Sequence, residues 1–164
     1  MNWTKLSAAG DVLSSVAILI TLVYLAIQTQ QNADAIMAST RQEILSTDQE
    51  FLIEMSKFEG VETLRYKQEL TNDERAKLGY LLITFIRMRE SNWMQHKSGV
   101  LDEKTWQSYR KSIGAMLGNP NARKFWQNYV VANEAMDPEF IADINDLLVL
   151  SPVGDRSGII SAFD

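Results

Sequence analysis

The 164-residue chain has no cysteine, one histidine and only three prolines. Without cysteine it cannot form disulfide bonds, thiolate metal sites, iron–sulfur clusters or a cysteine nucleophile. A metal site made of several histidines is also excluded, and a Ser-His-Asp triad would have to be built around His96. The sequence therefore predicts no cofactor and favours a protein that is not an enzyme.

Regular strand alternation and internal repeats of fixed period are also missing from the sequence. Neither glycine nor proline occurs between Gly10 and Gly60, so one helix can start near the N-terminus and continue far beyond it. The polar cluster Gln28, Gln30, Gln31 and Asn32 would equally suit a break near residue 32. We expect an all-α protein: one N-terminal membrane helix, able to continue as a long helix, and then a small helical bundle.

Charge is unevenly distributed along the chain, whose net charge is −5. Residues 34–74 carry −6, residues 75–124 carry +7 and residues 125–164 carry −6. An overall negative charge argues against general nucleic-acid binding, which needs concentrated lysine and arginine. The basic middle segment is interpreted as packing beside its acidic neighbours, and a basic face near anionic lipid headgroups is the alternative.

The run from Val12 to Ile27 is uncharged, and ten of its sixteen residues are Leu, Ile or Val. Their transfer into a bilayer is worth about −3 to −6 kcal/mol. A cleaved signal peptide and a buried core helix are the alternatives. We expect a single-pass anchor in contact with membrane lipid, and divide the chain into an anchor (1–32), a helical domain (33–150) and a flexible tail (151–164).

Four small residues, Gly10, Ser14, Ala17 and Thr21, recur every three or four positions in this segment. This spacing places them on one helix face, where small side chains allow a second membrane helix to approach closely. The face predicts self-association into a homo-oligomer, although small residues are also common in such helices without that role.

Local start signals predict four helices in the remaining chain. Thr71 and Glu74 have the spacing of a capping box, and a helix opened there should end before Gly99. Asp102 is the N-cap of the next helix. Two proline signals follow, at Asn119-Pro120 and at Asp137-Pro138.

The chain resembles a large group of uncharacterised bacterial proteins in which one N-terminal membrane helix precedes a helical domain. The matching residues are Val23-Tyr24-Leu25-Ala26-Ile27-Gln28, Asn32, Glu90, Trp93, Gln95, Gly99-Val100-Leu101-Asp102, Trp106, Trp126 and Phe140 after Pro138. The resemblance implies the membrane-anchored helical fold but no activity, substrate or cofactor. Together with the lack of cysteine, it favours a cytoplasmic C-terminal domain.

Arg87, Glu90, Gln95 and His96 form a candidate polar site on one predicted helix. Charged residues grouped in this way either form ion pairs with one another in a buried network or bind a ligand. The function predicted from the sequence is a membrane-anchored interaction or scaffold protein that self-associates, with an unidentified protein partner. The alternatives are a ligand-binding or enzymatic domain with a pocket near Glu90 and His96, and a soluble bundle that buries its first helix.

Overall fold

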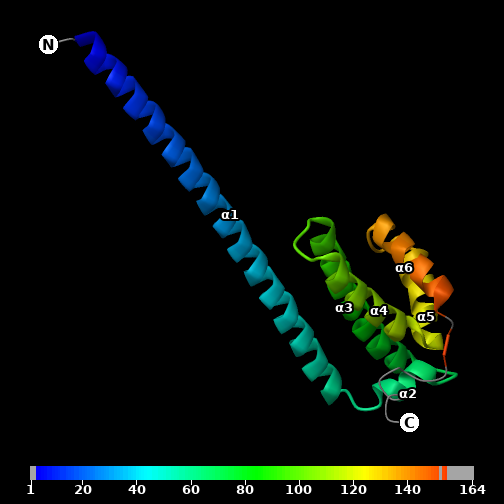
Figure 1. Cartoon of the computed structure of the whole chain (residues 1–164). Helices are drawn as coiled ribbons and strands as arrows, with labels where there is room; N and C mark the ends of the chain where they lie inside the picture. The colour runs from blue at the N-terminus through cyan, green and yellow to red at the C-terminus, as the bar shows by residue number, and fades with distance from the viewer. Residues whose placement is uncertain (1–2, 152, 155–164) are drawn as a thin grey trace. The chain divides into compact units, whose positions relative to one another are not determined.

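The computed structural model describes residues 3–151 and 153–154, and this part of the chain is helical and contains no β-strand. This confirms the all-α prediction of a long N-terminal helix and a small helical domain (Figure 1). The helices are α1 (Trp3–Lys57), α2 (Val61–Tyr66), α3 (Asn72–Lys97), α4 (Glu103–Leu117), α5 (Pro120–Phe125), the π-helix η1 (Trp126–Val131) and α6 (Pro138–Leu150).

Helix α1 continues without interruption through the polar cluster at residues 28–32, so the alternative of a break there is wrong. The chain divides into two compact units, Met1–Glu43 and Ile44–Asp164. The sequence predicts an anchor that ends at residue 32, and the boundary between the two compact units lies later in α1. The second unit includes the last turns of α1 because Phe51 and Met55 pack against the hydrophobic core there.

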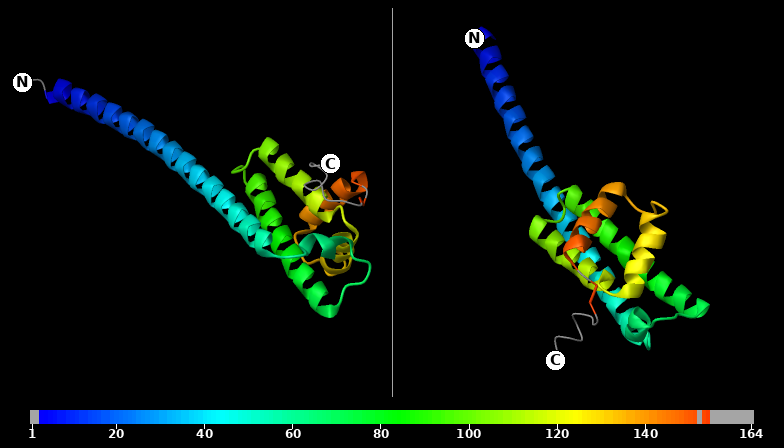
Figure 2. Two further views of the ribbon diagram at one scale, coloured as in Figure 1. Left: turned by 90° about the horizontal axis from the view of Figure 1, so that it is seen from below. Right: turned by 90° about the vertical axis from the view of Figure 1, so that its right-hand side faces the viewer.

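The second unit is a bundle organised around a hairpin of α3 and α4, and α6 packs on α4 (Figure 2). Its centre is apolar and closely packed: Leu82, Ile113, Trp126, Phe140 and Ile144 have no exposed surface. Helices α4 and α6 pack against each other at Gly114, where an added Cβ would make an ordinary van der Waals contact of 3.5 Å with the Leu147 side chain. The bundle therefore has a continuous core of its own.

All the predicted helix start signals are confirmed. The Thr71 and Glu74 side chains form the complete capping box of α3, and Asp102, Asn119 and Asp137 each accept a backbone N–H bond at the start of α4, α5 and α6. Gly99 follows α3 with a φ of 81°, a conformation that glycine adopts without a side-chain penalty. These contacts are local, so the sequence alone could indicate them.

Other features had no counterpart in the sequence-based expectation. In the apolar run from Leu81 to Ile86, helical periodicity turns Thr84 to solvent. Helix α2 and the π-helix η1 carried no start signal. The predicted tail falls mostly outside the described residues, but within them the Gly154 N–H donates to the Gly118 carbonyl at 2.8 Å.

An ion pair holds the last part of α1 against the bundle. Arg89 of α3 donates to both carboxylate oxygens of Asp48 at 2.9 and 3.1 Å, and only 8% of the arginine side chain is exposed. The guanidinium also lies 4.9 Å from the centre of the Phe85 ring and 4.7 Å from that of Tyr109. Burial, followed by the charge of Asp48, raises the pKa of Tyr109.

Replacing one partner of this pair should destabilise the protein strongly. Asp48→Asn leaves the Arg89 charge buried without a counter-ion, so we expect the free energy of unfolding to fall by roughly 3 kcal/mol. Urea unfolding of the full chain, followed by near-ultraviolet circular dichroism, measures the change. The control is Glu54→Gln, which breaks the exposed Glu54–Lys57 pair on the same helix and should have little effect. An unchanged midpoint for Asp48→Asn would contradict this role.

Candidate functional site

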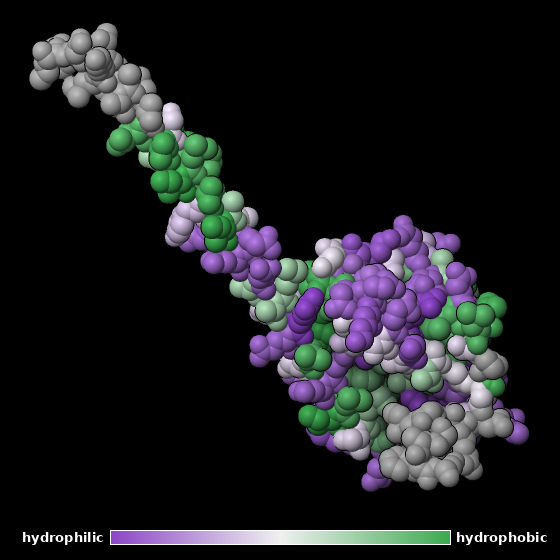
Figure 3. Space-filling model, viewed as in Figure 1, coloured by the Kyte–Doolittle hydropathy of each residue, from purple (hydrophilic) through white to green (hydrophobic). Residues whose placement is uncertain are grey.

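The apolar segment of α1 has no cover from any described part of the chain. All residues from Leu13 to Ile27 are exposed, and Leu13 is 75% exposed. Figure 3 shows them as a hydrophobic band on α1. Apolar side chains occur on every side of the helix, a pattern that requires either a buried or a lipid environment. Among the described helices, α1 is the one long and apolar enough to cross a membrane.

The small-residue face, Gly10, Ser14, Ala17 and Thr21, is part of this exposed segment. The Ser14 hydroxyl donates to the Gly10 carbonyl and the Thr21 hydroxyl to the Ala17 carbonyl, each at 2.9 Å. Both polar hydroxyls are thus satisfied within the helix, as an apolar surrounding requires. The face remains open to another helix.

The candidate polar site divides into two groups of contacts. In the first, the Glu90 carboxylate accepts a bond of 2.7 Å from Arg87 and another of 2.7 Å from the Asp137 backbone N–H. Arg87 also donates to the Ala135 carbonyl at 2.7 Å. Glu90 is buried. These bonds fix the connection between η1 and α6 to α3.

In the second group, Gln95 and His96 hold the turn between α3 and α4. The Gln95 backbone carbonyl accepts the N–H groups of Val100 and Leu101. The His96 Nδ1 lies 3.1 Å from the Leu101 carbonyl, and Nε2 lies 3.2 Å from the Glu103 carboxylate. The ring of His96 stacks on Trp106 with centroids 6.1 Å apart.

The four residues therefore lie at two structural junctions and do not converge on one cavity. Each carboxylate oxygen of Glu90 accepts one hydrogen bond from the protein, one from Arg87 within α3 and one from the Asp137 N–H before α6. Within the described residues, no group of three histidines, cysteines or carboxylates is arranged to bind a metal. The contacts of all four residues are those of a structural network.

Glu90→Gln tests the structural role of the first group. Glutamine keeps the size but loses the charge paired with Arg87, so we expect a loss of roughly 2 kcal/mol in the free energy of unfolding. Hydrogen exchange should also speed up at the Asp137 amide, which loses a charged acceptor. Lys97→Gln, which removes an exposed pair to Glu139, is the matched control on the same helix and should change neither readout. Slow exchange at Asp137 in Glu90→Gln would refute this role.

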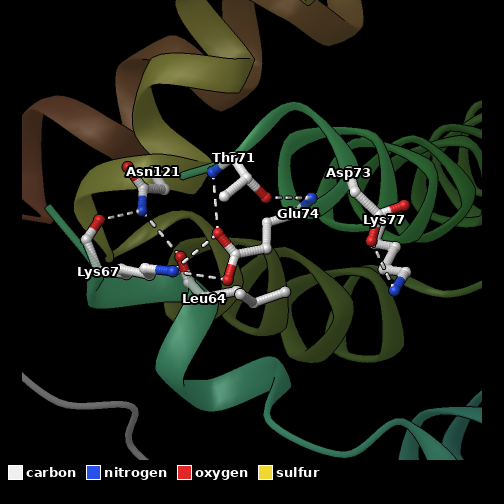
Figure 4. A network of polar contacts seen from close by, with 7 residues as sticks. All are labelled: Leu64, Lys67, Thr71, Asp73, Glu74, Lys77 and Asn121. Atoms are coloured by element: carbon white, nitrogen blue, oxygen red, sulfur yellow. Dashed lines mark hydrogen bonds and ion pairs between the residues drawn. The ribbon is translucent and has the colours of Figure 1, made fainter. Parts of the chain in front are cut away.

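A second polar network joins α2, α3 and α5, and sequence reasoning missed most of it (Figure 4). Lys67 donates to both oxygens of Glu74, and Asn121 donates to the Leu64 and Lys67 carbonyls at 2.8 Å each. The bond from Lys67, and then the one from the Thr71 backbone, lowers the pKa of Glu74. Only the Thr71–Glu74 part had a signal in the sequence, because Asn121 acts across more than fifty residues.

Comparisons with protein-family models, with curated proteins and with solved structures found no match for the chain. The resemblance to bacterial membrane-anchored helical proteins stays a prediction. The exposed apolar segment of α1 is the candidate functional site that the geometry supports best.

Proposed function

We propose that this protein is a membrane-anchored helical interaction module that self-associates through α1. The observation that carries the proposal is the segment Leu13–Ile27, which is apolar on all sides and has no protein cover. Exposure of so many large apolar side chains to water would be unfavourable, by roughly 1.5 kcal/mol or more for each. A bilayer removes this cost.

The small-residue face supplies the contact between copies. Glycine inside a helix costs about 1 kcal/mol relative to alanine. Among the described side chains, none comes within 4 Å of a Cβ added at Gly10, so packing within this described part gives no reason for glycine there. Close approach of a second α1 helix gives that reason.

The bundle of residues 44–150 then presents its surface on one side of the membrane, which we place in the cytoplasm. The absence of cysteine fits a reducing compartment, and the resemblance noted above favours the same side. The bundle would serve as the docking part for a protein partner.

Membrane extraction tests the anchor. We expect the full-length chain to stay in the membrane pellet after an alkaline carbonate wash, at a gel mobility that shows no cleavage. Replacing Ile18, Ile20 and Leu22 together by aspartate should release it, because each central charge costs about 2.5 to 3.5 kcal/mol of insertion. The control replaces Leu45 and Leu52, which lie in the second unit, by aspartate. Complete release of the unmodified chain by the wash would refute anchoring.

Single cysteines test self-association without background, because the natural chain has none. Ala17→Cys and Thr21→Cys should form disulfide-linked dimers in membranes after mild oxidation. Leu19→Cys is the matched control, since it lies about 180° around the helix from this face. Equal crosslinking at the three positions, or none at any, would exclude the proposed face.

A further inference from the structure

A cleft of about 410 Å³ lies in the bundle between α3 and the α5–η1 segment. Its volume is in the range of small-molecule sites, roughly 300 to 1,000 Å³. Leu70 and Phe125 supply its accessible apolar lining above the buried Leu78 and Leu82, and Arg75, Lys124 and Tyr129 contribute to its polar part. Arg87, Glu90, Gln95 and His96 do not line it.

Gly79 keeps part of this cleft open. It lies inside α3, where glycine destabilises a helix relative to alanine. A Cβ added there would meet the Phe125 ring at 3.5 Å, an ordinary van der Waals contact. Neither backbone conformation nor close packing therefore requires glycine at this position. What its missing side chain provides is space in the cleft.

The side chains that line the cleft include two cations, Arg75 and Lys124, and no carboxylate. The two acids at the start of α3 each form an ion pair with a lysine: Glu74 with Lys67, and Asp73 with Lys77 at 2.7 Å (Figure 4). Arg75 and Lys124 have no ion-pair partner among residues 3–151 and 153–154, and both are exposed. Two cations thus flank an apolar lining.

The π-helix η1 contributes an aromatic wall. Its backbone bond from the Ala132 N–H to the Gln127 carbonyl spans five residues, and π-helical turns frequently occur at functional sites. The Tyr129 ring stacks on Phe125 with centroids 5.1 Å apart and is 48% exposed. This pair offers a flat apolar surface beside Lys124.

We propose that this cleft binds a small amphipathic anion, with a carboxylate or phosphate at Arg75 and Lys124 and an apolar, preferably aromatic, body against Leu70 and Phe125. Charge-assisted bonds fix the head of the ligand, and burial of its body supplies the affinity. The inference does not depend on anchoring or self-association.

Calorimetric titration with 1-naphthoate tests the site in the full-length protein, in the medium that keeps it monodisperse and against a protein-free blank. We expect saturable binding, weakened about twofold to fivefold by Arg75→Gln or Lys124→Gln alone and more by both together. The neutral isostere 1-naphthalenemethanol should bind equally to all these variants. Lys111→Gln, on the exposed surface of α4, is the control and should leave naphthoate binding unchanged.

Gly79 variants test the location independently of charge. Gly79→Leu fills the cleft and should abolish binding of both probes. Gly79→Ala should raise the thermal unfolding midpoint and weaken both probes slightly, which separates loss of space from loss of folding. Undetectable naphthoate binding up to about 1 mM would overturn the proposal. Equal affinity in the wild type and in the Arg75→Gln/Lys124→Gln variant would do so as well.

Competition by lipid distinguishes two sources of the anion. For this test the protein is carried in a nanodisc of defined lipid composition, and naphthoate binding is measured with and without phosphatidylglycerol in the disc. Displacement that phosphatidylcholine does not reproduce assigns the site to a lipid headgroup. Naphthoate binding that is indifferent to both lipids assigns it to a free anion. Displacement by both lipids alike would overturn recognition of charge.

Discussion

The second unit depends on the buried pair of Asp48 and Arg89. An arginine placed among Phe85, Tyr109 and the end of α1 would be costly without a counter-charge, and Asp48 supplies it from a helix that is otherwise far away in the sequence. The guanidinium plane also suits the two aromatic faces. The pair adds a directional contact to the apolar packing of Phe51 and Met55, which alone would permit several registers of α1 on the bundle.

Helix α1 thus has two environments within one continuous element. From residue 44 onward it packs Phe51 and Met55 on the core. The segment around Leu19 is apolar on all sides and has no such partner. Hydrophobic pattern, rather than any change in backbone, separates the two environments. The same helix thus carries an exposed apolar segment at one end and packs on a protein core at the other.

The fold class and the helix starts could be predicted because their causes are local. Asp102 caps a helix through atoms three residues away, and Asn119-Pro120 acts within one turn. The site was harder to predict. Glu90 stood out in the sequence because it follows Arg87 and Arg89 closely, but its acceptance of the Asp137 N–H depends on the packing of distant elements. Arg75 and Lys124 carried no motif, since their relation arises only when α3 and α5 meet.

The separation between Asp48 and Arg89 also bears on the order in which the protein folds. Most contacts of the bundle join neighbours in sequence, such as α3 with α4 and α5 with η1, so little chain entropy is lost in closing them. The Asp48–Arg89 contact spans 41 residues, and its acidic partner is synthesised first. Phe51 and Met55 therefore lack their final packing partners until α3 and α4 have left the ribosome. During that interval the end of α1 exposes apolar side chains that a chaperone or a second nascent chain can bind.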